Sequence, residues 1–297
     1  MSTRIAFLKG HGTENDFVIL PDPENALDLP PAAVAALCDR RAGIGGDGLL
    51  HVVRSAAHPE AREMAAEAEW FMDYRNGDGS VAEMCGNGVR VFARYLQRAG
   101  LVTEGDLAVA TRGGVKSVHI AKAGSPGGSA AGDITVGMGR AVFPAGDVTV
   151  SVGERSWPAR HVNMGNPHAV AFVDDLAHAG DLFTPPPFSP ASAYPDGVNV
   201  EFVVDRGPRH VAVRVHERGA GETRSCGTGA CAVAVAAARR DGADPAGTGT
   251  PVTYTVDVPG GTLVITERPD GEIEMTGPAV IVAEGEIDAE WFGAGRA

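Results

Sequence analysis

Cys85-Gly86-Asn87-Gly88 leads directly into an apolar helical pattern, and Cys226-Gly227-Thr228-Gly229 does the same 141 residues later. Each stretch places a cysteine at a glycine-rich turn immediately before a helix. The first backbone N–H groups of a helix are unpaired and carry partial positive charge, which stabilises a nearby thiolate. Cysteine pKa values fall in such settings from about 8.5 to as low as about 3.5. The two stretches therefore predict a pair of acid–base thiols, one for each face of a substrate.

The two halves of the chain can be aligned around these cysteines. Asn15-Asp16-Phe17 matches Asn166-Pro167-His168, because each precedes an apolar strand pattern, and Asn76 is matched with Asn199. The matches occur in the same order in both halves, at offsets of 151, 123 and 141 residues. They predict two copies of one α/β unit. A pseudo-twofold axis would then place the two cysteines across one cleft.

Hydrophobic periodicity supports mixed α/β units. The helix after Cys85 has an apolar face at i, i+3, i+4 and i+7, formed by Val89, Phe92, Ala93 and Leu96. We expect its other side to carry Arg90, Arg94 and Arg98. The helix over 228–240 is apolar nearly all round, which predicts burial on every side. A further helix is predicted over 31–41, and 123–132 has the composition of a linker or long hairpin. Strands are predicted at 4–9, 17–20, 49–53, 69–74, 133–138, 147–152, 159–163, 169–173, 198–204, 210–216, 251–257, 262–267 and 272–275.

Composition narrows the class of protein. The 297 residues suit one large domain or two ordinary ones, and 44% hydrophobic with 21% charged residues fits a globular protein. A net charge of −13 argues against nucleic-acid or anionic-membrane partners. The N-terminus reads as a strand and not as a signal peptide, and no stretch approaches a membrane span. We therefore expect a cytoplasmic protein.

The remaining motifs indicate no cofactor. The four cysteines form no C-x-x-C pair, so neither a zinc site nor a disulfide scaffold is indicated, and Cys38 and Cys231 are interpreted as buried filler. The glycine-rich run 43–48 lacks the Lys-Ser/Thr ending of a phosphate-binding loop. No pyridoxal lysine motif or cluster of metal ligands is evident. Paired cysteines alone suit proton transfer at carbon, in which one takes the α-proton of an amino acid and the other protonates the opposite face.

At this point the chain resembles the diaminopimelate epimerases. The matching segments are 12–17, 43–48, 75–80, 84–88, 164–168, 197–200, 217–223, 225–230 and 259–261, in order through most of the chain. The resemblance implies a cofactor-independent enzyme that interconverts LL- and meso-2,6-diaminopimelate in lysine and cell-wall precursor synthesis. It also implies an α/β (α+β) fold of two pseudo-symmetric domains, each a β-barrel-like sheet around a central helix, and a homodimer. The domains expected are 1–129 with 277–297, and 130–276.

The resemblance assigns roles to individual residues. Cys85 and Cys226 are expected to be the acid and the base. His168 supports them, although a lone histidine is more often structural, and Glu217 would contact the reacting amino group. The residues expected to hold the reacting carboxylate through backbone N–H groups are Gly86, Asn87, Gly227 and Thr228. Those expected to bind the distal amino-carboxylate end are Asn15, Asn76, Asn166, Asn199 and Arg218.

The sequence departs from the family pattern at one substrate-contacting position, and two alternative functions remain to be considered. Many family members have glutamine at the position of Gly48, so that substrate contact is not expected here. A racemase or epimerase for proline, hydroxyproline or histidine is the nearest alternative, which Arg218 and the asparagines disfavour because such substrates lack a second amino-carboxylate end. A thiol redox sensor or binding protein is the alternative of a different class. Facing cysteines would also form a disulfide on oxidation, which we expect to inactivate an epimerase.

Overall fold

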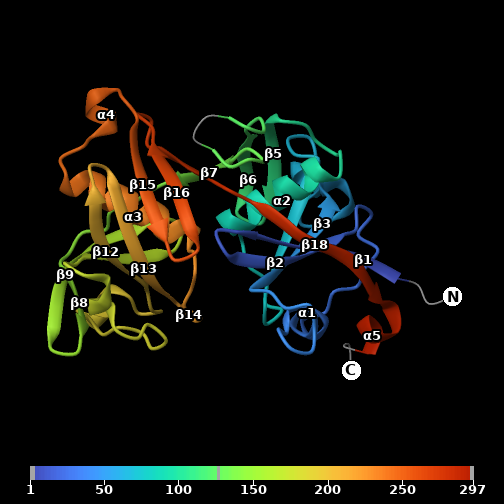
Figure 1. The fold of residues 1–297 in the computed structure, drawn as a ribbon, viewed down its shortest axis with the longest axis horizontal. Helices are drawn as coiled ribbons and strands as arrows, with labels where there is room; N and C mark the ends of the chain where they lie inside the picture. Colours follow the sequence, from blue (N-terminus) through green and yellow to red (C-terminus); the bar gives the residue numbers. More distant parts are fainter. Residues whose placement is uncertain (1–3, 126–127, 295–297) are drawn as a thin grey trace. The chain divides into compact units, whose positions relative to one another are not determined.

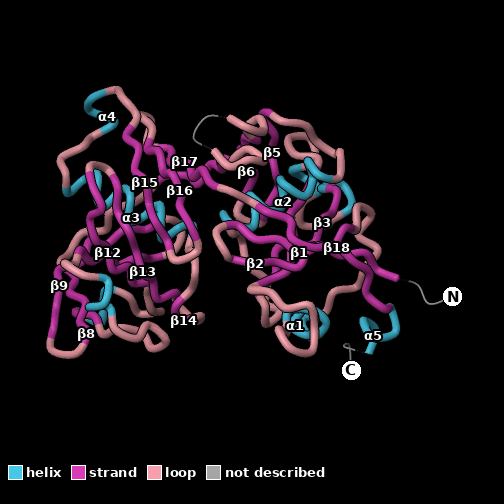
Figure 2. Tube along the Cα trace, viewed as in Figure 1, coloured by secondary structure: helices cyan, strands magenta, loops and turns pink. Residues whose placement is uncertain are grey.

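The computed structural model describes residues 4–125 and 128–294 (Figure 1). The chain divides into two compact units: unit 1 is Met1–Val136 with Gly277–Ala297, and unit 2 is Gly137–Thr276. Residues 126–127 of the segment expected as a linker or long hairpin lie outside the described residues. Most of the regular secondary structure in both units is strand, with little helix, as Figure 2 shows.

Unit 1 is a curled sheet with one helix against its inner face. The strand order is β6-β5-β4-β3-β2-β1-β18, with parallel pairing in β2/β3 and β4/β5. The central helix α2 (Gly86–Arg98) contacts β6, β4, β3, β2, β1 and β18. The other elements of the unit are β1 (Arg4–Gly12), β2 (Asn15–Pro21), α1 (Pro31–Cys38), β3 (Gly48–Arg54), β4 (Trp70–Asn76), β5 (Gly105–Thr111), β6 (Gly114–Ile120), β18 (Val280–Asp288) and α5 (Ala289–Ala294).

Unit 2 repeats this arrangement around α3 (Gly227–Arg240). Its strand order is β8-β9-β10-β12-β13-β15-β16-β17-β7, with parallel pairing in β10/β12 and β13/β15. Helix α3 contacts β9, β10, β12, β13, β15 and β16. The other elements are β7 (Ile134–Arg140), β8 (Val148–Val152), β9 (Arg155–Asn163), β10 (Pro167–Phe172), β11 (Phe188–Ser189), β12 (Asn199–Gly207), β13 (His210–Glu217), β14 (Gly221–Glu222), α4 (Pro245–Thr248), β15 (Val252–Val258), β16 (Gly261–Glu267) and β17 (Glu272–Gly277).

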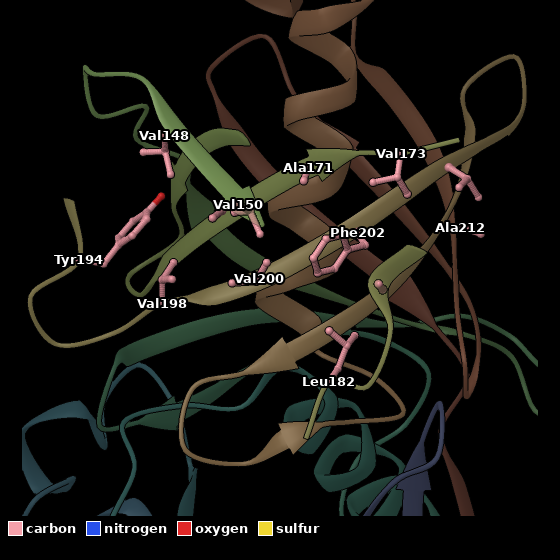
Figure 3. Packing of buried hydrophobic residues seen from close by; sticks show 13 residues of the cluster. Val148, Val150, Ala171, Val173, Leu182, Tyr194, Val198, Val200, Phe202 and Ala212 are labelled. Atoms are coloured by element: carbon pink, nitrogen blue, oxygen red, sulfur yellow. The ribbon is translucent and has the colours of Figure 1, made fainter. Parts of the chain in front are cut away.

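The outer face of the unit 2 sheet is also buried. Val200 and Phe202 of β12 point into an apolar cluster with Val150 and Leu182 (Figure 3). Successive side chains of a strand point to opposite faces. Glu201 therefore points to the other face of the sheet, toward α3.

The two central helices are both buried. Helix α3 is buried nearly all round, as expected. Arg90 and Arg94, which were expected on the side of α2 opposite its apolar face, are buried as well, whereas Arg98 is half exposed. A guanidinium has five N–H donors, so it can be buried where backbone carbonyls accept them. Arg94 donates to carbonyl oxygens of Ala131 at 2.9 Å and Ala279 at 3.2 Å, and also to Gly132.

The register of the sheets corrects one of the matched pairs. Phe17 pairs with Gly48 across β2/β3, and His168 pairs with Asn199 across β10/β12. Gly48 is therefore the counterpart of Asn199, at the same 151-residue offset that relates Asn15 to Asn166. Asn76, which pairs with Gly48, corresponds to Glu217 at the 141-residue offset of the cysteines. The offset of 123 residues between Asn76 and Asn199 differs from the other two because these residues were matched by type and do not occupy equivalent strand positions.

Several elements differ from the predicted ones. Helix α1 ends at Cys38 and not at 41, because Asp39 adopts extended backbone angles. The hairpin of β5 and β6 was not predicted, although Gly113-Gly114 is a turn signal. Strand β18, which pairs with β1, was also not predicted. The boundary between the units falls within β7, compared with the 129/130 boundary expected. No helix in the described part of the chain combines the length and the apolar character that crossing a bilayer requires.

Candidate active site

Cys85 is the N-cap of α2. Its backbone is extended (φ −138°, ψ 115°), and its Sγ accepts a hydrogen bond from the backbone N–H of Gly88 at 3.4 Å. An N-cap side chain satisfies one of the otherwise unpaired N–H groups of the first turn. Here that acceptor is a sulfur atom, so the helix end directs its partial positive charge at a thiol.

Asn15 and Asn87 lie beside this sulfur. Oδ1 of Asn15 is 3.6 Å from Sγ of Cys85 and accepts a hydrogen bond from Nδ2 of Asn87 at 3.2 Å. The Asn15 amide in turn donates to Asp47 at 2.7 Å, and Arg40 contacts the same carboxylate at 2.7 Å. The structure therefore brings Asn15, Asn87 and Cys85 together, and the hydrogen bond to Asp47 holds the Asn15 amide in its orientation.

Asn76 lies at the end of β4, where its side chain donates to Ser80 Oγ at 2.9 Å. Its strand partner Gly48 has no space for a side chain. A Cβ added there would lie 2.6 Å from the carbonyl oxygen of Arg75 and 2.8 Å from the ring of Tyr74. The ring of Tyr74 occupies the space that a longer side chain at this position would need.

Cys226 repeats the geometry of Cys85 in unit 2. It is the N-cap of α3, and its Sγ accepts from the N–H of Gly229 at 3.4 Å. The hydroxyl of Thr228 is 3.6 Å from the same sulfur. Burial raises the pKa of the Cys226 thiol well above its usual value, and the nearby Glu217 and Glu201 carboxylates raise it further. Cys226 is therefore protonated at neutral pH in the ligand-free protein.

Glu217, expected at the substrate amino group, lies beside Cys226. Burial raises the pKa of the Glu217 carboxyl group, while hydrogen bonds from Thr223 and Cys226 act in the opposite direction. A carboxyl group and a thiol that share a hydrogen bond can exchange a proton over a short path. Glu217 thus lies within hydrogen-bonding distance of Cys226, a contact that the spacing of the sequence alone did not indicate.

His168 and Asn166 complete the cluster around Cys226. Nε2 of His168 is 3.0 Å from Oδ1 of Asn166, whose Nδ2 donates to Thr228 at 3.3 Å. Nδ1 of His168 is 2.6 Å from Oε1 of Glu201. Sequence reasoning missed Glu201, since it stands within an apolar strand pattern. The only signal available was a charged residue at a position where its neighbours predict burial.

Asn199 and Arg218 form a separate pair at the ends of β12 and β13. Oδ1 of Asn199 accepts from the backbone N–H of Arg218 at 2.9 Å, and its Nδ2 donates to the carbonyl of Pro167 at 3.0 Å. The guanidinium of Arg218 donates to the carbonyl of Asp196 at 3.2 Å. It also lines a small cavity whose other walls are mostly apolar and include Pro185, Phe188, Val198 and Val200.

The other two cysteines are filler, as predicted. Cys38 and Cys231 are buried, and none of the four cysteines forms a disulfide within the described residues. Burial raises the pKa of Cys38 to about 11, so it is no thiolate at neutral pH. Neither of them caps a helix, in contrast to Cys85 and Cys226.

Comparison with known proteins matches nearly the whole chain to one family. A family model described as diaminopimelate epimerase matches residues 7–144 and 160–282. The diaminopimelate epimerase of Streptomyces coelicolor is 87% identical over 98% of both chains. That of Mycolicibacterium smegmatis is 47% identical over 96% of this chain and 98% of its own. A phenazine biosynthesis protein of the PhzF family from Bacillus anthracis shares the fold, with a TM-score of 0.71 and 16% identity over 96% of this chain and 99% of that one.

Proposed function

The chain belongs to the diaminopimelate epimerase family, and from this premise we propose that it interconverts LL- and meso-2,6-diaminopimelate by acid–base chemistry of two cysteines. The observation that supports the mechanism is that the same arrangement of a cysteine and a helix N-terminus occurs in both units. Each unit presents a cysteine as the N-cap of its buried central helix, with the sulfur 3.4 Å from the N–H of the third residue after it. A fold that needed only tight turns would not require sulfur at both positions.

The reaction needs one thiolate and one thiol. The thiolate takes the α-proton and becomes a thiol, while the electron pair of the C–H bond stays on the α-carbon. The second thiol then gives its proton to the opposite face of that carbon and becomes a thiolate. No atom is gained or lost, so no oxidant or cofactor is consumed, and the reverse reaction exchanges the two roles.

The environments of the two sulfurs suggest how the reaction starts. Because Cys226 is held as a thiol by burial and by Glu217 and Glu201, it is the proton donor in the first turnover of the free enzyme. Cys85 is then the base. After Cys226 has given up its proton, the neighbouring Glu217 and the N–H of Gly229 determine how readily it is protonated again.

The helix N-termini supply the electrostatic part of the mechanism. The backbone N–H groups of Gly86 and Asn87, and those of Gly227 and Thr228, belong to the first turns of α2 and α3. Such groups bind carboxylates and stabilise the negative charge that develops as the α-proton leaves. We assign them to the carboxylate of the reacting centre.

The distal end of the substrate is assigned to Arg218 and the asparagines. A guanidinium binds a carboxylate bidentately, and Asn199 lies beside Arg218, where its Oδ1 accepts from the Arg218 backbone N–H at 2.9 Å. A short amino acid would leave these polar groups unpaired, at a cost of roughly 1–3 kcal/mol for each group. This difference favours diaminopimelate over proline or hydroxyproline.

We also infer the setting of the enzyme. The product serves lysine and cell-wall precursor synthesis, which places the enzyme in the cytoplasm. A homodimer is inferred as well, and the exposed Val280 and Val282 of β18 offer an apolar surface for it. Sedimentation of the reduced protein tests this, with a single species of twice the chain mass as the expected result.

A substrate panel tests the activity. The reduced protein is incubated with LL-diaminopimelate, L-proline, trans-4-hydroxy-L-proline and L-histidine, without pyridoxal phosphate or added metal, and the stereoisomers are separated by chiral chromatography. We expect conversion of diaminopimelate alone. Turnover of a proline and not of diaminopimelate would reject the proposed substrate, whereas turnover of none would favour the redox or binding alternative.

A further inference from the structure

His168 and Glu201 form a fully buried pair in unit 2. Both side chains have zero exposure, and Nδ1 lies 2.6 Å from Oε1. The second oxygen of Glu201, Oε2, has no hydrogen-bond partner among the described residues. Burying a carboxylate costs several kcal/mol unless its partners compensate for the lost hydration. Because burial of the Glu201 carboxylate costs free energy, its presence at this position is not explained by packing.

Unit 1 fills the same two positions with apolar residues. The register of β2/β3 and β10/β12 makes Phe17 the counterpart of His168 and Leu50 the counterpart of Glu201. The helices confirm the match: a Cβ on Gly88 would lie 3.2 Å from Leu50 Cδ2, and one on Gly229 would lie 3.0 Å from Glu201 Oε1. The same fold therefore forms with an apolar Phe–Leu pair at these positions. Packing alone does not explain why unit 2 has histidine and glutamate there.

The pair lies at the far end of a hydrogen-bonded series that leads to the sulfur of Cys226. From His168 the series continues through Asn166 at 3.0 Å and Thr228 at 3.3 Å to Cys226 at 3.6 Å. The Asn166 amide nitrogen donates to Thr228, so the hydroxyl proton of Thr228 is free to point at Sγ. This amide orientation requires His168 to donate from Nε2 to Oδ1.

We propose that Glu201 is a positioning residue for the epimerisation. Its carboxylate accepts a hydrogen bond from Nδ1–H of His168. This bond holds His168, Asn166 and Thr228 in the orientation that directs the Thr228 hydroxyl proton at the Cys226 sulfur. The proposal rests on the proposed function of Cys226. Both ring nitrogens of His168 then donate, Nδ1 to Glu201 and Nε2 to Asn166. A hydroxyl donor aimed at the sulfur favours its thiolate form, which must exist after each proton transfer to substrate.

The test begins with a structural readout that needs no activity. The imidazole 15N resonances of His168 are recorded in the reduced, ligand-free protein and in Glu201→Leu, which copies the unit 1 residue. We expect a proton on Nδ1 in the wild type and its loss in Glu201→Leu. An unprotonated Nδ1 in the wild type, or no difference between the two proteins, would overturn the proposal whatever the substrate proves to be.

The kinetic arm is a double-mutant cycle with Glu201→Leu and Thr228→Val. Loss of a residue that orients an active-site histidine lowers activity by about 10- to 100-fold, by analogy with partners of metal-bound histidines. If Glu201 acts through Thr228, the double variant is no slower than the worse single variant, whereas a merely structural role gives effects on kcat that multiply. Multiplying effects would overturn the proposal.

A matched control removes another buried carboxylate of unit 2. Glu267 is 7% exposed and pairs with Arg239 at 2.9 Å, away from the series. We expect Glu267→Leu to leave kcat unchanged. Each variant removes one partner of a buried pair, so both should unfold at a lower temperature than the wild type, and the activities are compared at matched folded fractions. A loss of activity in Glu201→Leu that disappears at matched folded fraction would assign Glu201 to the fold and overturn the proposal. Inactivity of the wild type toward diaminopimelate would instead reject the proposed function.

Discussion

The sulfur of Cys226 lies 3.4 Å from the backbone nitrogen of Gly229, the same distance that separates the sulfur of Cys85 from the nitrogen of Gly88. The two helix ends are thus alike in geometry but differ in their surroundings. The carboxylates of Glu217 and Glu201 lie near Cys226, whereas the amides of Asn15 and Asn87 lie near Cys85. Two helix ends of the same local geometry therefore hold their sulfurs in chemically different settings.

The first prediction concerns the titration of Cys226. Its pKa is raised, so the thiol should persist through neutral pH and ionise only in the alkaline range. Glu217→Gln removes a negative charge that disfavours the thiolate, so the pKa should fall. The pKa of Cys226 is measured from the ultraviolet absorbance of its thiolate as a function of pH. The absorbance of Cys85→Ala/Cys226→Ala is subtracted from that of Cys85→Ala, so that only Cys226 contributes to the difference. Glu222→Gln is the control, since Glu222 pairs with Arg214; an equal fall there would contradict the assignment to Glu217.

The second prediction compares the two glycines that face the sulfurs. A methyl group on Gly229 would lie 3.2 Å from Sγ of Cys226, whereas one on Gly88 would lie 3.7 Å from Sγ of Cys85 and 3.2 Å from a flexible end of Leu50. Gly229→Ala should therefore lower kcat by about 10- to 100-fold, as small displacements of reacting groups do. Gly88→Ala should have a smaller effect. Steady-state kinetics at matched folded fractions decide this, and a larger loss in Gly88→Ala would refute it.

The third prediction concerns Gly48. Gly48→Gln should destabilise the protein by about 1–3 kcal/mol, because overpacking forces Tyr74 and the Arg75 carbonyl to shift. Gly207→Ala is the control, as an added Cβ there meets nothing within 4 Å, and it should stay within about 0.5 kcal/mol. Urea unfolding gives both values. An unchanged free energy of unfolding in Gly48→Gln would show that Tyr74 does not fill this space.

The fourth prediction compares two arginines of α2. Arg94→Ala leaves several buried carbonyl oxygens without a donor and should cost about 3 kcal/mol or more, at roughly 1–3 kcal/mol for each unsatisfied group. Arg98→Ala loses only a half-exposed ion pair with Glu284, worth about 0–1 kcal/mol. Urea unfolding again measures both. Equal costs would mean that the buried carbonyls find other donors.

The central helices and their cysteines could be predicted because local signals determine them. A glycine turn followed by apolar residues at helical spacing predicted α2 and α3, and the order of matched motifs predicted a repeat. The burial of Arg90 and Arg94 could not be predicted, since it depends on carbonyls contributed by the segment between β17 and β18 and by the segment before β7. Amphipathic spacing shows which face is apolar but not whether the other face is covered.

The polar cluster of unit 2 was found only in part. Asn166, His168 and Thr228 stand in recognisable motifs, and the structure connects them by hydrogen bonds. Glu201 could not be assigned from sequence, because strand pairing and not residue spacing brings it to His168. The match of Asn76 with Asn199 failed for the same reason: register across β3/β4 and β12/β13 is a property of the folded sheet.

The most direct test of the two-thiol mechanism is NMR of the reduced protein with LL-diaminopimelate in D₂O, beside Cys85→Ala and Cys226→Ala. We predict deuterium at the α-carbon together with meso product in the wild type. Epimerisation should fall by about 100-fold or more in each variant, the contribution expected of a general acid or base. Retention of meso formation near the wild-type rate by either folded variant would contradict the account, because one of the two sulfurs would then be dispensable.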